Sequence, residues 1–250
     1  MTAGMKLHIV SATNTGRRKN NEDAVLTDEQ LGLAVVADGM GGYEGGEVAS
    51  RITVEAVREL VARSAREDNC VWPYAADLSR SSEENELLVA ARLANDRVIA
   101  RRQGQLQMMG ATLAVVRLRG GHATIAHVGD SRVYRVRAGQ AVALTRDHSL
   151  YEELAASGEK LPPRGQFTYG NVITRAIGTH SARPEVCRVE VAPGDLLVVC
   201  TDGLWDPVPD AELAELCTRF APEEACQRLI DRALAHGGTD NITVAIIAVT

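Results

Sequence analysis

The stretch Ala37-Asp38-Gly39-Met40-Gly41-Gly42-Tyr43-Glu44-Gly45-Gly46 organises this chain. It follows the apolar run 31–37, which has the composition of a buried strand, and it precedes an apolar pattern of helical period that begins at Glu47. Five of the eight residues 39–46 are glycines, so the backbone can approach a bound ion or phosphate closely. A strand therefore delivers the carboxylate of Asp38 into a glycine-rich loop, and a helix leaves that loop.

This loop does not match the nucleotide-binding templates. A P-loop ends in Gly-Lys-Ser/Thr, whereas Gly46 is followed here by Glu47. The dinucleotide fingerprint needs a third glycine where this chain has Glu44. A tight glycine turn without a ligand is the alternative interpretation, and the choice depends on which residues accompany Asp38.

Composition excludes several classes of protein. The chain has 250 residues with 27 basic and 33 acidic side chains, a net charge of −6, so no basic excess predicts a nucleic-acid surface. No apolar run reaches 18 residues, which argues against a membrane span. The five cysteines are odd in number and form no Cys-x-x-Cys pair, which argues against a zinc ribbon or a disulfide framework. We expect a cytoplasmic protein, and a monomer.

The periodicity predicts strands and helices in clusters. Strands are expected at 6–11, 31–37, 112–118, 122–128, 132–137, 140–144, 195–201 and 242–249. Helices are expected at 47–65, 83–102, about 150–157, about 210–219 and 222–236. The two-residue turns Gly120-Gly121 and Ala138-Gly139 require antiparallel pairing. The fold class is therefore α+β, with sheets covered by helices. Without repeats or linkers, 1–250 is expected to form a single domain, with an irregular excursion at about 145–178.

One pattern recurs at the ends of the expected strands. Asp38, Asp130 and Asp202 each follow an apolar strand and stand beside a glycine, and Asp240 precedes the last strand. Any one of these residues is more often a turn residue than a ligand. Strand ends in stacked sheets can converge on one edge, so four such corners point to a shared site.

Convergence of carboxylates has an electrostatic consequence. Two carboxylates about 4 Å apart repel by about 4 kcal/mol at an effective dielectric constant near 20. Several ionised together need cations between them. Surroundings made of carboxylate oxygens, with no His or Cys, suit Mg²⁺ or Mn²⁺ better than zinc. A pair of such ions would acidify a water molecule and present it to a phosphoryl group.

At this point the chain resembles the metal-dependent protein Ser/Thr phosphatase family (PPM, type 2C), in particular its compact bacterial members. Six motifs in the order of the family carry the resemblance, and they span nearly the whole chain. They are Arg18-x-Asn20-Asn21-Glu22-Asp23, Ala37-Asp38-Gly39-Met40-Gly41-Gly42, Gly110-Ala111-Thr112, Val128-Gly129-Asp130-Ser131-Arg132, Thr201-Asp202-Gly203-Leu204-Trp205-Asp206 and Gly238-Thr239-Asp240-Asn241-Ile242-Thr243-Val244.

The resemblance implies a four-layer α/β/β/α sandwich of two antiparallel sheets between helices. It also implies two tightly bound Mg²⁺ or Mn²⁺ ions and a third, weaker one. Asp38 would bridge the two tight ions. Glu22 and the Gly39 carbonyl would complete one of them, and Asp202 and Asp240 the other.

The remaining site residues follow from the same resemblance. Asp130, with Asp202, would hold the third ion. Asp23 would hold a water molecule from a position behind the metal ligands, and Arg18 would bind the substrate phosphate, because its guanidinium fork matches phosphate oxygens. Segment 145–178 corresponds to the family's flap. Met40 stands where some relatives have a histidine proposed as general acid, and since methionine donates no proton, the general acid stays unidentified.

The expected function is hydrolysis of phosphoserine and phosphothreonine in proteins, opposing a bacterial Ser/Thr kinase of the eukaryotic type. Two alternatives stay open. The first is a catalytically inactive metal-binding signalling module of the same fold, and the second is an unrelated metal-dependent phosphoesterase that acts on small molecules or nucleotides. Arg18 has an alternative interpretation as a solvated loop cation beside Arg17 and Lys19. His127 and His148 are expected to be hydrogen-bonded structural residues, and Trp205 to pack in the core.

Overall fold

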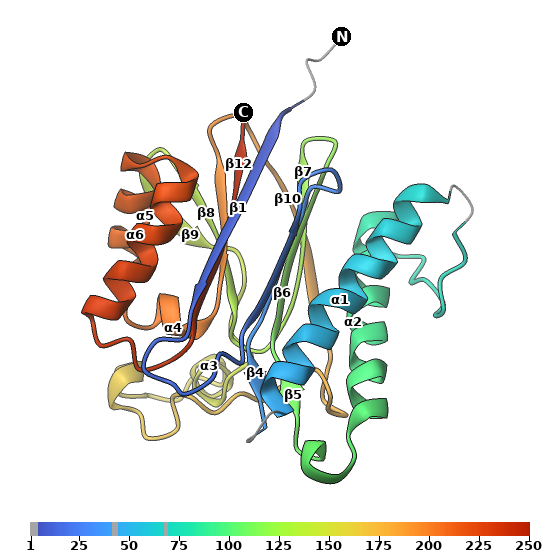
Figure 1. Cartoon of the computed structure of the whole chain (residues 1–250), viewed down its shortest axis with the longest axis horizontal. Helices are drawn as coiled ribbons and strands as arrows, with labels where there is room; N and C mark the ends of the chain where they lie inside the picture. The colour runs from blue at the N-terminus through green and yellow to red at the C-terminus, as the bar shows by residue number, and fades with distance from the viewer. Residues whose placement is uncertain (1–4, 42–44, 68–69) are drawn as a thin grey trace.

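The computed structural model describes residues 5–41, 45–67 and 70–250 and forms two facing sheets with helices on both outer sides (Figure 1). The strands are β1 (Leu7–Asn14), β2 (Ala24–Asp28), β3 (Leu33–Ala37), β4 (Gly39–Met40), β5 (Gly110–Ala111), β6 (Leu113–Arg119), β7 (His122–Val128), β8 (Arg132–Arg137), β9 (Gln140–Ala143), β10 (Glu185–Glu190), β11 (Leu196–Cys200) and β12 (Ile242–Val249). The helices are α1 (Gly45–Arg66), α2 (Ser82–Arg101), α3 (Leu150–Ala156), α4 (Asp202–Trp205), α5 (Asp210–Arg219) and α6 (Pro222–Ala235), with short 3₁₀ turns η1 (Gly104–Leu106) and η2 (Arg164–Gln166).

Each large sheet has five strands, and all neighbours pair antiparallel. The first sheet has the order β1-β12-β11-β8-β9 and the second β10-β7-β6-β3-β2, while β4 and β5 form a separate two-stranded pair. Helices α5 and α6 cover the first sheet, and α1 and α2 cover the second (Figure 1). The expected four-layer α/β/β/α sandwich is confirmed. No helix in the described part of the chain is long and apolar enough to cross a membrane.

Three clusters of buried apolar side chains fill the spaces between the four layers of the sandwich. Strand β3 illustrates why its sequence is a continuous apolar run: both faces of the strand are covered. Leu33 and Val35 pack against α1 and α2, while Ala34 and Val36 face the other sheet. All of these side chains are fully buried. A third apolar layer fills the space between the first sheet and its helices α4 to α6.

The two predicted hairpins have the backbone that their turns require. The β6–β7 turn has Gly120 and Gly121 at φ 57° and 78°, and the β8–β9 turn has Ala138 and Gly139 at φ 51° and 76°. Positive φ at both central residues is the turn whose twist matches that of the flanking strands. Ala138 is the only residue other than glycine at positive φ in the described part of the chain.

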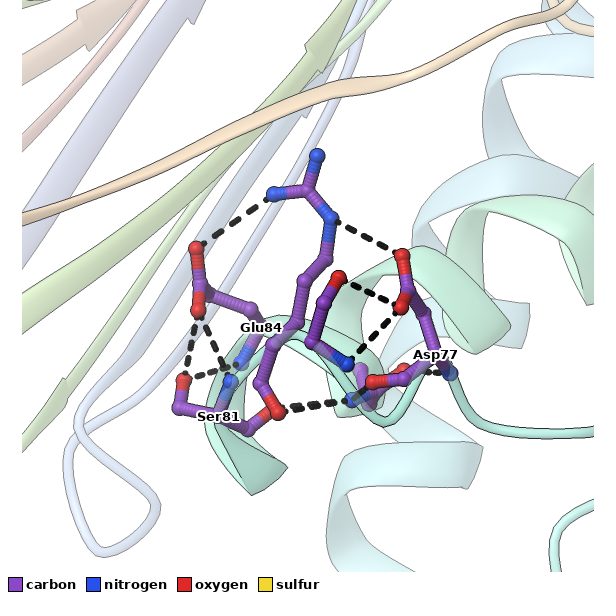
Figure 2. A network of polar contacts seen from close by, with 6 residues as sticks. Asp77, Ser81 and Glu84 are labelled. Atoms are coloured by element: carbon purple, nitrogen blue, oxygen red, sulfur yellow. Dashed lines mark hydrogen bonds and ion pairs between the residues drawn. The ribbon is translucent and has the colours of Figure 1, made fainter.

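Helix α2 begins at a capping box, seen in Figure 2. The Ser81 hydroxyl accepts the Glu84 N–H at 3.2 Å, and the Glu84 carboxylate accepts the Ser81 N–H at 2.9 Å. Asp77 closes the preceding turn by accepting from the Ser79 N–H at 2.9 Å. These bonds satisfy N–H groups that have no partner within the helix and fix where α2 begins.

Several elements were absent from the sequence-based prediction. Strands β2 and β10 lie at the two edges of the second sheet, and their mixed polar and apolar residues gave no strong signal. The two-residue strands β4 and β5 and the one-turn helix α4 were missed as well, because periodicity cannot detect elements this short. Residues 42–44 of the glycine loop lie outside the described residues.

Ala138 supplies a test of the turn geometry. A side chain at positive φ costs about 1–2 kcal/mol, whereas glycine's extra unfolded-state freedom costs roughly 0.5–1 kcal/mol. We therefore expect Ala138→Gly to raise the free energy of unfolding by about 0.5–1 kcal/mol in urea denaturation. The neighbouring Gly139→Ala should lower it. A loss of stability in Ala138→Gly would contradict the turn assignment.

Candidate active site

The aspartates expected from sequence meet at one edge of the sandwich. In the second sheet, the registers of β3 and β7 with β6 place the ends of β3 and β7 at one edge. In the first sheet, the register of β11 with β12 places the end of β11 beside the start of β12. Asp38, Asp130, Asp202 and Asp240 stand at these four strand ends. Figure 1 places the short elements β4, β5, α3 and α4 at the same end of the molecule, opposite the two termini. Antiparallel pairing within two facing sheets is what brings these distant positions together.

The carboxyl groups lie close enough to perturb one another. Burial raises the pKa of Asp38 well above its ordinary value, and the charges of Asp23, Asp202 and Asp130 raise it further. The side chains of Asp38 and Asp202 interact directly, and burial raises the pKa of both. Two carboxylates this close are not both ionised unless a proton or a cation balances their charge, so the cluster does not hold all of its charges without compensation.

Neighbouring members of the cluster behave in the same way. Burial and the charge of Asp240 raise the pKa of Asp202 to about 6. Burial raises the pKa of Asp23 to about 7. Burial and the charge of Asp202 raise the pKa of Asp130 to about 8. Several acidic groups whose pKa values are displaced together, in one place, mark a functional site.

The residues present fit divalent cations. The Oδ1 atoms of Asp23 and Asp202 are buried, and each lacks a hydrogen-bond partner among the described residues. A buried carboxylate oxygen without a donor is costly unless a cation contacts it. The atoms available as metal ligands are all oxygens, which suits Mg²⁺ or Mn²⁺.

Glu22 and Gly39 come together through close backbone contacts. The Gly39 N–H donates to the Glu22 carbonyl at 3.1 Å. A Cβ at Gly39 would lie 2.1 Å from the carbonyl oxygen of Gly46, and a Cβ at Gly46 would lie 2.7 Å from the Glu22 carboxylate. The glycines at the start of α1 are therefore needed for close approach, and they bring Glu22 against that helix terminus.

Arg18 lies beside the cluster, with its guanidinium half in solvent. Its Nη2 contacts Asp240 Oδ2 at 2.7 Å, and its Nε donates to the Thr239 carbonyl at 3.2 Å. The loop that carries it approaches β12 closely, because Gly16 has φ +61° and a Cβ there would lie 2.0 Å from the Asp240 carbonyl oxygen. Arg18 is therefore oriented by the site, which the interpretation as a free loop cation does not explain.

Two polar residues that hold the site had no assigned role in the sequence analysis. Asn241 donates from Nδ2 to the carbonyls of Thr15 and Asn20, both at 2.9 Å, and its Oδ1 accepts the Glu22 N–H at 2.8 Å. Thr112 accepts the Asp38 N–H at 2.8 Å. Both residues lie in the quoted motifs, which was the available signal.

Asp130 is supported through its backbone. Its carbonyl accepts the Trp205 Nε1–H at 2.9 Å, and the Arg132 guanidinium stacks 3.5 Å from the centre of the Trp205 ring. Arg132 makes two bonds to buried Asp147, at 2.7 and 2.8 Å, and Arg164 contacts the same carboxylate at 2.5 Å. Trp205 therefore packs in the core, as expected, and also links the 145–178 segment to the cluster.

His127 and His148 are hydrogen-bonded within the fold, as the sequence analysis expected. The His127 Nε2 bonds the Arg146 carbonyl at 2.8 Å, and the His148 Nδ1 accepts the Gly129 N–H at 3.1 Å. With Glu185 the two rings form a group of three possible metal ligands. However, Nδ1 of His148 is taken by the Gly129 N–H, and Nε2 lies 3.1 Å from the Arg175 guanidinium. The positive charge of Arg175 therefore stands where a metal ion would have to bind. The rings also stack, 4.4 Å apart.

Comparison with known proteins agrees with this architecture, which is that of the metal-dependent protein phosphatases. The family model described as "Protein phosphatase 2C" matches residues 12–241. The chain belongs to the protein phosphatase 2C family.

Similar proteins come from several bacteria. The chain is 32% identical to the serine/threonine protein phosphatase PstP of Mycobacterium tuberculosis, over 92% of this chain and 42% of that protein, so it spans less than half of PstP. It is 31% identical to the serine/threonine phosphatase stp of Listeria monocytogenes, over 96% of this chain and 95% of that one.

Solved structures share the fold. The catalytic domain of PstP in complex with two manganese ions is 32% identical, with a TM-score of 0.83, over 99% of this chain and all of that one. The serine/threonine phosphatase of S. agalactiae is 33% identical, with a TM-score of 0.85, over 98% of this chain and all of that one.

The raised carboxyl pKa values predict how stability depends on pH when divalent cations are removed. Between pH 4 and 8 the folded protein then retains protons on Asp202, Asp23 and Asp130 that the unfolded chain, with an ordinary pKa of 3.8, has released. This stabilising contribution is complete below pH 4 and is lost progressively between pH 4 and 8. Each group contributes about 1.4 kcal/mol per pH unit between its unfolded and its folded pKa. We therefore expect the free energy of unfolding to fall by several kcal/mol between pH 5 and 8.5 in chelator.

Urea denaturation across this pH range, with chelator and with excess Mn²⁺, measures the effect. Mn²⁺ should flatten the dependence, because a bound cation stabilises the ionised carboxylates. A flat profile in chelator would mean that these groups are not buried together.

Proposed function

We propose that this chain is a metal-dependent phosphatase that hydrolyses phosphoserine and phosphothreonine in proteins. The observation that carries the proposal is the convergence of Asp38, Asp130 and Asp202 at one edge of the sandwich. Beside them, the buried Oδ1 atoms of Asp23 and Asp202 have no hydrogen-bond donor among the described residues. The names of the relatives, serine/threonine phosphatases in each case described above, support the class of substrate.

The metal ligands in this proposal follow the geometry of the cluster. Asp38 would contact both tightly bound Mg²⁺ or Mn²⁺ ions, since its carboxyl group lies among those of its neighbours. Glu22 and the Gly39 carbonyl would complete one ion, and Asp202 with Asp240 the other. The ions, when bound, would supply an acidified water molecule as nucleophile. The manganese ions in the PstP structure support this choice of metal.

Asp130 is the proposed ligand of a third, weaker ion. Its carboxyl group is buried and interacts with Asp202, with which it would share that ion. The backbone bond from Trp205 would hold it in place.

The other residues act on water and phosphate. Asp23 has one carboxylate oxygen bonded to the Thr201 hydroxyl at 2.9 Å and one without a partner, so the second can accept a hydrogen bond from the attacking water. Arg18, held at the mouth of the cluster, would bind the phosphate oxygens of the substrate. Met40 donates no proton, so the departing serine or threonine oxygen would be protonated by water.

Two other functions compete with this proposal. An inactive metal-binding module has no need of Arg18 or Asp23, and their orientation beside the carboxylates favours catalysis. A phosphoesterase for nucleotides or other small molecules would differ from the proposed protein phosphatase only in the substrate that it hydrolyses.

The biological setting is part of the same proposal. We expect a cytoplasmic monomer, a single domain over 1–250 with a flap at about 145–178, and phosphoprotein substrates of a bacterial Ser/Thr kinase pathway. The two bonds from Arg132, at the start of β8, to buried Asp147 support a flap attached beside the cluster.

Asp38→Asn tests the proposed function. Wild-type protein with Mn²⁺ should release phosphate from a phosphothreonine peptide and should lose this activity in chelator. Asp38→Asn should lower kcat at least about 100-fold, roughly 2.7 kcal/mol, because one carboxylate positions both ions. Exposed Asp206→Asn, in the same motif as Asp202, is the matched control and should keep its activity.

Three outcomes would contradict the proposal. A chelator-resistant activity would exclude metal catalysis. An Asp38→Asn variant that keeps a third of wild-type kcat would leave Asp38 as a turn residue. Turnover of nucleotides in preference to the peptide would favour the small-molecule phosphoesterase.

Arg18→Ala tests the phosphate contact. If Arg18 binds the phosphate equally in the ground and transition states, its loss should raise KM for the phosphopeptide about tenfold, roughly 1.4 kcal/mol, with little change in kcat. Inorganic phosphate should also inhibit this variant less. The neighbouring exposed Arg17→Ala is the control. Equal KM values for the two variants would return Arg18 to the role of a solvated cation.

A further inference from the structure

Two buried threonines lie beside the aspartate cluster, in segments whose other buried residues are mostly apolar. Thr201 follows β11 and Thr243 lies in β12, and neither side chain is exposed to solvent. Valine has nearly the same shape and would pack in either position without a polar atom. Packing alone therefore does not explain threonine at these positions, and the hydrogen bonds of the two hydroxyls do.

The Thr201 hydroxyl has its hydrogen directed at Asp23. Its Oγ1 accepts the Thr243 N–H at 3.1 Å and contacts Asp23 Oδ2 at 2.9 Å. An ionised carboxylate only accepts, so in that contact Thr201 is the donor. One backbone group and one carboxylate thus fix the orientation of this hydroxyl.

The Thr243 hydroxyl is oriented from the opposite side. Thr13 and Thr243 are partners in the β1–β12 register, with their hydroxyl oxygens 2.7 Å apart. The Asn21 side-chain amide donates to the Thr13 hydroxyl at 2.8 Å, which favours Thr13 as donor to Thr243. Thr243 is therefore anchored to β1 by its hydroxyl, and its own N–H orients the Thr201 hydroxyl.

The backbone of Asp23 is held by the same residues. Its N–H donates to Asn21 Oδ1 at 3.1 Å. Asn21 therefore begins the chain of hydroxyls and also fixes the main chain at the residue where that chain ends. Asp23 Oδ2 is bound from the hydroxyl side, while Oδ1 is buried and has no partner among the described residues.

We propose that Thr201 and Thr243 are positioning residues. Thr201 holds one oxygen of Asp23 so that its other oxygen faces the reacting water, and Thr243 fixes the Thr201 hydroxyl from behind. Neither threonine touches the substrate. Both act through Asp23, and hydrogen bonds in such a chain strengthen one another. The kinetic part of this inference rests on the proposed function. The orientation of Asp23 itself does not.

The experiment compares, at each threonine, a variant that keeps the side-chain shape with a variant that keeps the hydroxyl. Thr243→Val and Thr201→Val keep the shape and remove the hydroxyl, while Thr243→Ser and Thr201→Ser keep the hydroxyl. We expect each valine variant to lower kcat on the phosphothreonine peptide about tenfold with KM changed less than twofold. The serine variants should stay within threefold of wild type. Thr53→Val, at a buried threonine in α1 whose hydroxyl bonds the Ala49 carbonyl, is the control for removing a buried hydroxyl elsewhere.

An Asp23→Asn background separates positioning from simple structural damage. If the threonines act through Asp23, Thr243→Val should cause no further loss of kcat in that background. Equal losses in both backgrounds, or a serine variant as impaired as the valine variant, would overturn the inference.

Calorimetry with Mn²⁺ alone gives a readout that does not depend on turnover. Groups behind metal ligands typically change metal affinity 10- to 100-fold when they are removed. We expect Thr243→Val to weaken Mn²⁺ binding at least fivefold in the wild-type background and not in Asp23→Asn. If the wild type failed to hydrolyse phosphopeptides, the proposed function would fall and this comparison would still decide the inference, because an unchanged Mn²⁺ affinity in Thr243→Val would overturn it.

Discussion

The mutual repulsion of carboxyl groups held together beneath the surface is the constraint on which the rest of this structure depends. The pKa values of Asp38 and Asp202 are both raised by burial and by their acidic neighbours. Each close pair of charges costs about 4 kcal/mol at an effective dielectric constant near 20. Such a cluster persists only where a rigid scaffold prevents the side chains from separating, and its unpartnered oxygens leave places for cations.

The sandwich supplies that rigidity through close backbone contacts. A Cβ at Gly203 would lie 1.9 Å from the Asn241 carbonyl oxygen, so the corner that carries Asp202 packs directly on the strand that follows Asp240. Neutral groups then orient the acidic residues: Thr112 bonds the backbone of Asp38, and Thr201 bonds the carboxylate of Asp23. Arg132 and Arg164 are directed instead to Asp147, one step away from the cluster. This arrangement holds the acidic groups in place while leaving their charge to be balanced by metal ions.

The strongly periodic parts of the fold could be predicted from the sequence. The last strand was expected at 242–249 and is Ile242–Val249, and the helix expected at about 210–219 is Asp210–Arg219. In these segments the spacing of apolar residues along the chain predicts which side chains are buried. Strands β2 and β10 escaped prediction because each is an edge strand, whose mixture of polar and apolar residues is compatible with a loop.

By itself, the sequence determined the composition of the site: aspartates beside glycines at strand ends, six motifs in the order of a phosphatase family, and oxygen donors suited to Mg²⁺ or Mn²⁺. It did not determine how these positions meet. Asn241 contacts residues more than 200 positions away, and the chain of hydroxyls from Thr13 to Asp23 passes through a register pair between the first and last strands. These contacts depend on which strands become neighbours and in which register, and local periodicity carries no information about either, because pairing is decided by the packing of the whole sandwich.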